Sequence, residues 1–153
     1  MNDTIKLNGQ IEINLIRDGK IVDTRKIKNI ITNAGKAEAI NLLGNVSSPV
    51  SFTYLAVGIG TTAAAATDTA LESEIVDSGL ERAAATVTRV TTTTANDTLQ
   101  LVKSWTVSGT KAVTEAGILN DASAGTLLGH QVFSAINVVS GDTLALTYKV
   151  ILA

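Results

Sequence analysis

Hydrophobic and polar residues alternate along much of the chain, and this period of two is the pattern of β-strands that bury one face. The alternation is clearest in residues 11–27, on both sides of the dipeptide Asp18-Gly19. Asp-Gly is strongly preferred in two-residue type I′ turns, which join antiparallel strands. Residues 11–27 are therefore predicted to form a β-hairpin near the N-terminus.

The two-residue turn also predicts the register of this hairpin. Counting outward from the turn places Leu15 opposite Val22 and Glu12 opposite Arg25. The first pair would share the buried face of the hairpin. The second pair would attract each other across the two strands, because opposite charges that face each other stabilise a sheet.

After the hairpin, the apolar spacing changes to that of a helix. Thr32-Asn33 offers an N-cap, and small or apolar residues then recur every three positions up to a glycine. Residues 33–43 are predicted to form a short helix. A second helical turn is predicted at residues 69–75, because Thr69 and Glu72 have the spacing of a capping box.

Residues 51–152 combine short apolar runs with frequent turn residues, which is typical of antiparallel strands. We therefore expect a mainly β protein, an antiparallel β-sandwich or barrel with one or two short helices and an N-terminal β-hairpin. Residues 1–10 would form an N-terminal arm, and residues 11–153 a single β-rich domain whose sandwich occupies residues 51–152.

Composition excludes several classes of function. The chain has 153 residues, no cysteine and one histidine, His130, which rules out cysteine catalysis and multi-histidine metal sites. Its net charge of −2 gives no electrostatic basis for binding nucleic acid or an anionic membrane. No apolar run is long enough to span a bilayer. Charged residues make up 17%, fewer than the usual ~25%, which is consistent with a surface that partners cover in part.

Two motifs have both a chemical and a structural interpretation. Gly58 and Gly60 follow a predicted strand, but Ala63 stands where a dinucleotide-binding loop has its third glycine. Glu72 and Glu74 are two residues apart, so on a helical turn they point to different sides and cannot share a substrate as acid and base. We interpret both motifs as structural.

His130 has no neighbour at metal-ligand spacing, and we interpret it as a structural histidine or one at a subunit contact. Trp105 lies in an alternating strand and is expected in the core or at an interface. We expect no catalytic residue, no metal site, no cofactor and no small-molecule substrate. The chain is predicted not to be an enzyme.

Several short segments stand in an order typical of one group of proteins. The segments are 54–62 (YLAVGIGTT), 67–74 (TDTALESE), 115–119 (EAGIL), Phe133 and 141–144 (GDTL). In this order they resemble small structural proteins of tailed bacteriophages, over roughly residues 30–152. Ile118-Leu119 departs from the Leu-Phe that the group more often has. The resemblance implies a virion component, without fixing its place on the head or the tail.

We therefore expect a capsid decoration (cement) protein that binds the outer head surface and stabilises the shell by bridging capsid subunits. It would be made in the host cytoplasm, and its partners would be the major capsid protein and copies of itself in a homotrimer. The arm and the hairpin are predicted to make the contact, because an edge strand can extend a neighbour's sheet. The candidate contact residues are Ile5, Leu7, Ile11, Ile13, Arg17, Lys20, Arg25 and Lys26.

Two other functions are compatible with the sequence. The chain could be a tail, neck, baseplate or fibre-associated protein of a tailed phage, since the same fold would serve there. It could also be a carbohydrate-binding or hydrolytic β-sandwich, although such proteins need exposed aromatic residues and paired acids. Aromatic residues make up 3% of this chain, which disfavours that function.

Overall fold

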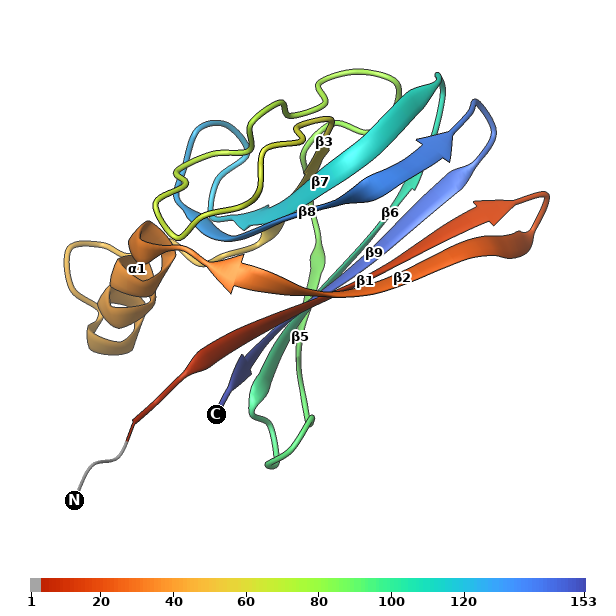
Figure 1. Ribbon diagram of the computed structural model, residues 1–153. Coiled ribbons are helices and arrows are strands. Elements are labelled where there is room, and N and C mark those ends of the chain that lie inside the picture. The colour runs from red at the N-terminus through yellow and green to blue at the C-terminus, as the bar shows by residue number, and fades with distance from the viewer. Residues whose placement is uncertain (1–3) are drawn as a thin grey trace.

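The computed structural model describes residues 4–153, and this part of the chain contains nine β-strands and one α-helix (Figure 1). The elements in chain order are β1 (Leu7–Arg17), β2 (Lys20–Ile31), α1 (Asn33–Gly44), β3 (Tyr54–Gly58), β4 (Ala83–Ala84), β5 (Thr86–Val90), β6 (Thr98–Thr106), β7 (Lys111–Leu119), β8 (Leu127–Val138) and β9 (Thr143–Leu152).

The strands form two antiparallel sheets that join into a nearly closed barrel. The lower sheet has the order β2-β1-β9-β6-β5, and the upper sheet has the order β4-β3-β7-β8-β2. Strand β2 belongs to both sheets, because Ile30 and Ile31 at its end pair with β8. On the opposite side, Ala85 alone separates β4 from β5, so the chain passes directly from one sheet to the other. The predicted mainly β sandwich or barrel is confirmed.

Figure 1 shows the two sheets facing each other, and the alternating apolar residues of their strands make the core between them. Ile11 and Ile13 of β1 face inward, and so do Leu144 and Leu146 of β9. Trp105 is also buried, as expected, and its indole N–H donates to the carbonyl of Glu81 over 2.9 Å.

The predicted hairpin is present, but the register that we predicted for it is wrong from Leu15 onward. Leu15 lies opposite Asp23 instead of Val22, because a β-bulge inserts one extra residue into β2. Val22 is that extra residue, and 54% of it is exposed. As a result Glu12 pairs with Lys26 instead of Arg25.

The expected arm at residues 1–10 also needs correction. Residues 1–3 lie outside the described part of the chain, and Leu7 already belongs to β1, which pairs with β2 on one side and β9 on the other. Lys6 and Ala153 continue this ladder by exchanging two backbone hydrogen bonds of 2.6 and 2.8 Å. Both ends of the described chain are therefore tied to each other.

Helix α1 begins and ends close to its predicted bounds. The side chain of Thr32 accepts the N–H of Gly35, which confirms the N-cap, and Asn45 ends the helix in the left-handed region with φ 49°. The helical turn predicted at residues 69–75 is absent. Glu72, which was to cap it, instead binds the loop before it, and Glu74 forms an isolated β-bridge with Gly58.

The close contact between α1 and β8 depends on a residue without a side chain. A Cβ added at Gly35 would lie 2.5 Å from the Cα of Leu128 and 2.7 Å from its carbonyl oxygen. These are backbone atoms of a central strand, which cannot move aside without disturbing the sheet.

We predict that Gly35→Ala lowers the free energy of unfolding by about 1–3 kcal/mol, because the added methyl group overpacks this contact. Gly44→Ala in the same helix is the matched control. Its new Cβ would meet only Cγ2 of Val46 at 3.0 Å, and because Val46 is 55% exposed it can shift, so the better helix propensity of alanine should leave stability unchanged or slightly higher. Urea unfolding of both variants tests this, and equal stability of the two would contradict it.

Candidate functional site

Three ionisable side chains form a row in which His130 and Glu115 are buried and Asp68 is partly exposed. His130 of β8 places its Nδ1 2.8 Å from Asp68 and its Nε2 2.9 Å from Glu115 of β7. Glu115 is 0% exposed and His130 is 2% exposed. The sequence predicted a structural histidine or one at a subunit contact, and it did not indicate these partners. The available sequence signal for a buried partner was the single glutamate within the mostly apolar strand VTEAGIL.

The carboxylate of Glu115 also organises the loop that follows β3. It accepts the backbone N–H groups of Gly60 over 2.9 Å, Ser73 over 2.7 Å and Glu72 over 3.0 Å. A Cβ at Gly60 would lie 2.6 Å from the carboxylate, and one at Gly58 would lie 2.3 Å from it. These two glycines therefore let the backbone approach a buried carboxylate. This close approach is the physical reason why glycine stands at both positions.

The pKa values of this row are shifted in directions that keep all three groups charged. Burial opposes charge on each group, but the hydrogen bonds outweigh it. Those to Glu115 and Asp68 raise the pKa of His130 above 6.5. The bond from His130, together with the backbone donors, lowers the pKa of Glu115, and the N–H of Ala65 with His130 lowers that of Asp68. The raised pKa and the carboxylates beside both ring nitrogens favour the imidazolium form of His130, which donates from both nitrogens.

A hollow of about 200 Å³ lies beside this row, lined in part by Thr62, Asp68, Glu72 and His130. Both ring nitrogens of His130 are already bound to carboxylates, so neither can take a proton from a substrate. Glu72 is also engaged, because it accepts the N–H groups of Thr61 and Thr62 and the hydroxyl of Thr62. The arrangement orders a loop and offers no free general base.

The expected partner contacts are distributed over several environments. Ile11 and Ile13 are only 1% exposed, so the expectation that they touch a partner is wrong, because the inward face of β1 is core. Ile5, Lys20 and Lys26 are exposed, and Leu7 is half-buried. These residues do not gather at one place on the sheet.

Arg17 and Arg25, also expected to face a partner, lie at the gap between the two sheets and bind groups of their own chain. Arg17 binds Asp142 through two bonds of 2.7 and 2.8 Å, and this pair lowers the pKa of Asp142 to about 2. Arg25 binds Asp23 and donates to the carbonyl of Ser134 in β8 over 3.2 Å. Their charges are therefore occupied within the chain.

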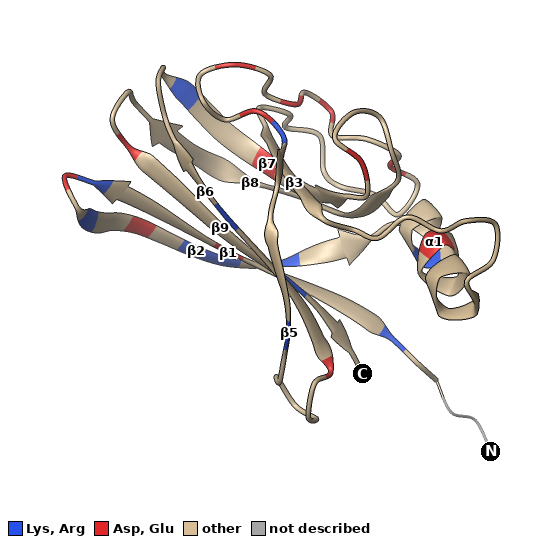
Figure 2. Cartoon of the chain, turned by 180° about the vertical axis from the view of Figure 1, so that it is seen from behind, with Lys and Arg blue, Asp and Glu red and all other residues tan. Residues whose placement is uncertain are grey.

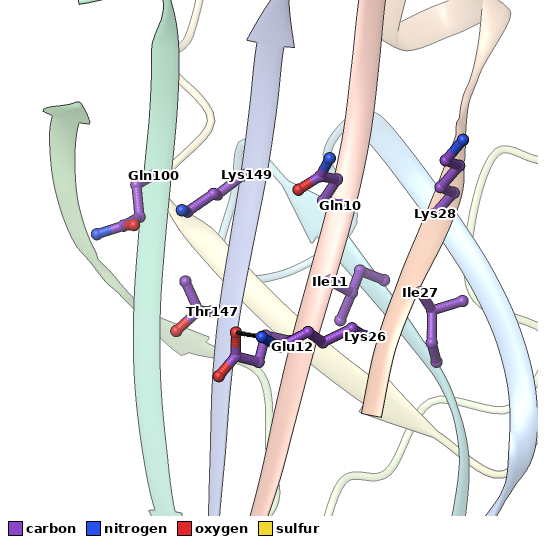
Figure 3. Close-up of a pocket in the computed structure, with 9 residues that line it drawn as sticks. All are labelled: Gln10, Ile11, Glu12, Lys26, Ile27, Lys28, Gln100, Thr147 and Lys149. Carbon is purple, nitrogen blue, oxygen red and sulfur yellow. Dashed lines mark ion pairs between the residues drawn. The ribbon is translucent and has the colours of Figure 1, made fainter. Parts of the chain in front are cut away.

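The outer face of the lower sheet is polar and carries charges of both signs (Figure 3). A broad depression of about 550 Å³ lies there, and its polar lining includes Glu12, Lys26, Lys28, Gln100 and Lys149. The ion pair of Glu12 with Lys26 is long, at 3.8 Å, and both side chains are well exposed. Surface pairs of this kind contribute little energy, so we interpret the face as a solvated one.

An apolar groove of about 400 Å³ lies between α1 and the open end of the lower sheet. Its apolar lining is Leu7, Ala39, Leu42, Leu43, Phe52, Leu99, Leu128, Val150 and Leu152. Leu43 is 83% exposed and Leu152 is 50% exposed. Of the eight expected contact residues, Leu7 alone lines this groove.

Helix α1 is poorly covered by its own domain. Gly35 is its only buried residue, and Ile40 on the helix is 66% exposed. A helix of 12 residues draws most of its stability from packing of its apolar side chains, so an uncovered apolar helix face is a sign of an interaction surface. We take the groove and the exposed face of α1 as the candidate binding surface and call it the α1 groove.

Comparisons with protein-family models, with curated proteins and with solved structures found no match to this chain. Within residues 4–153, the helix content offers no segment with the length and apolar character needed to cross a bilayer. The assignment of function therefore rests on the residues themselves and on the resemblance stated above.

The charge state of the buried row predicts how stability depends on pH. The raised pKa of His130 adds stability that is complete below 6.5 and is lost as the pH rises through the folded pKa. The lowered pKa values of Glu115 and Asp68 add stability that is complete above their ordinary values and is lost as the pH falls. Wild-type stability should therefore fall on the alkaline side of 6.5.

His130→Gln should lower the free energy of unfolding by about 3 kcal/mol, because it leaves Glu115 buried without its cation. His130→Gln should also lack the decrease in the free energy of unfolding above pH 6.5. Lys26→Gln, which alters an exposed pair, should keep the wild-type profile. Chemical unfolding across a pH series measures all three proteins. A wild-type profile that is flat above pH 6.5 would disprove the charged row.

Proposed function

We propose that this chain is a non-enzymatic structural protein of a tailed-phage virion, a decoration (cement) protein on the outer surface of the capsid. The observation that carries the proposal is the convergence of three of the five segments behind the resemblance, 54–62, 67–74 and 115–119. Gly60 of one segment and Glu72 of the next donate backbone N–H groups to Glu115 of a third, and Gly58 lies against the same carboxylate.

The contact between these segments makes the resemblance more specific than the segments are separately. Short segments with many alanines, threonines and glycines carry little information separately, but their contact in space makes them parts of one structural device. That device fixes the loop after β3 and leaves no free acid or base. This arrangement agrees with a protein that acts by being bound.

The α1 groove is the surface that we assign to the capsid protein. It replaces the arm and hairpin as the proposed contact, because most of their residues lie within the sheet or are paired internally. Binding only to the assembled shell would stabilise it by linkage. Many copies on one particle would add their separate contributions, so each contact could be weak. As proposed, the copies on the shell are homotrimers.

The first prediction from this proposal concerns copy number. In purified particles of the phage that encodes this chain, quantitative mass spectrometry should give a copy number equal to that of the major capsid protein or a simple fraction of it. A number many-fold lower would contradict decoration and favour the alternative, a tail, neck, baseplate or fibre-associated protein. Absence from the particle would reject the virion assignment altogether.

The second prediction concerns the α1 groove. Leu43→Glu should leave folding and thermal stability unchanged, because the side chain is 83% exposed, but should weaken binding to undecorated capsids at least tenfold. The matched control is Val76→Glu, at a residue that is 78% exposed and does not line the groove. Sedimentation of capsids with labelled protein measures the affinity. Equal binding by the two variants would exclude the groove as the contact.

A further inference from the structure

The unpaired strand edges of this fold differ in how well they are protected from pairing with another chain. Strand β2 is unpaired toward β8 over residues 20–29, and this stretch carries five charged residues and the bulge at Val22 (Figure 2). Strand β4, at the end of the upper sheet, has only two residues. Charges, bulges and short length are the usual devices that keep an edge strand from pairing with another chain.

Strand β5 is less protected, because it has five residues, one charged residue, Arg89, and no bulge in its pairing with β6. It forms the end of the lower sheet, and within residues 4–153 its backbone pairs only with β6. Its sequence is Thr-Val-Thr-Arg-Val, in which four of the five residues are exposed. Figure 1 shows β5 running beside β6 toward the turn at the open end of the molecule. One side of β5 therefore presents backbone N–H and C=O groups without strand partners.

We propose that β5 pairs with β5 of a second copy of this chain, antiparallel and across a two-fold axis at Thr88. This register places Thr86 opposite Val90 of the second copy and Val87 opposite Arg89, so all five residues are paired. It is self-complementary, as a two-fold contact must be. A register centred on Arg89 would instead set two arginines directly opposite each other, which is unfavourable.

The side chains on β5 fit this occupant. Val87 lies opposite Leu101 of β6 and Arg89 opposite Leu99, so both belong to the inner face of the lower sheet. In the pair, the 39% exposed Val87 of each copy would be covered by the aliphatic part of the facing Arg89. Arg89 has no ion pair within residues 4–153, and its charged end would stay in solvent.

This inference goes beyond the virion proposal and does not depend on it. The pair concerns the isolated chain and can be measured without any particle. It is also compatible with the homotrimer, because a two-fold contact can join two trimers. Even numbers of chains, two or six, are therefore expected in solution, whereas a monomer or a lone trimer would overturn the proposal.

The absence of cysteine allows a direct test of the register. In Thr88→Cys, the two introduced residues would face each other with Cα atoms about 4.5–5.5 Å apart. That separation lies within the ~4.4–6.8 Å that a disulfide requires. Under mild oxidation this variant should form a disulfide-linked dimer in high yield, measured by non-reducing gel electrophoresis.

Thr86→Cys is the matched control, on the same strand and the same face of the sheet. Its two sulfurs would belong to residues about 14 Å apart in the proposed register, so it should cross-link at least tenfold more slowly. Equal rates for the two variants would show random collision and overturn the pairing. A faster reaction at position 86 would also overturn it.

A second variant tests the contact without cross-linking. Thr88→Lys adds a charge on the exposed outer face, where the fold tolerates it, but would set two lysines opposite each other in the pair. Sedimentation equilibrium over a concentration series should give half the mass of the wild-type assembly, while the circular dichroism spectrum stays as in wild type. An unchanged mass would exclude β5 as the interface.

Discussion

The structure depends on the burial of one charged carboxylate. Glu115 lies in the middle of the upper sheet without exposure to solvent, where an isolated charge would be strongly destabilising. His130 supplies the opposite charge, and three backbone N–H groups from the segment after β3 supply the hydrogen bonds. The loop has to fold onto the sheet because the carboxylate needs its donors. A long segment between β3 and β4 thus becomes ordered without any secondary structure of its own.

The closure of the barrel is achieved by different means on its two sides. On one side a continuous backbone passes from β4 to β5, so the sheets are covalently joined with one residue between them. On the other side β2 pairs with β8 over only two residues, and beyond them the strands diverge. Arg17 and Arg25 reach across this gap to carbonyl groups of β8. At this gap, hydrogen bonds from side chains take the place of backbone hydrogen bonds between β2 and β8.

Periodicity and turn chemistry were sufficient to predict the fold class, the hairpin, the helix bounds and the buried Trp105. They failed where a single residue or a distant partner decides the outcome. The bulge at Val22 shifts the register of every pair beyond it, and nothing in the alternation marks the extra residue. Thr69 and Glu72 have the spacing of a cap, but Glu72 is bound by Thr61 and Thr62 instead. The row at Glu115 joins residues far apart in the chain, which local patterns cannot place together.

The hydrogen bonds between Lys6 and Ala153 have a topological consequence. Because these residues are adjacent in space, the described chain is close to a ring, and a short peptide linking its two ends would strain no strand. New ends could then be opened at the exposed turn of Asp18 and Gly19, giving a circular permutant with the same sheets. Lys6 and Ala153 therefore leave the sheet at one corner, next to Leu7 and Leu152, which both line the α1 groove.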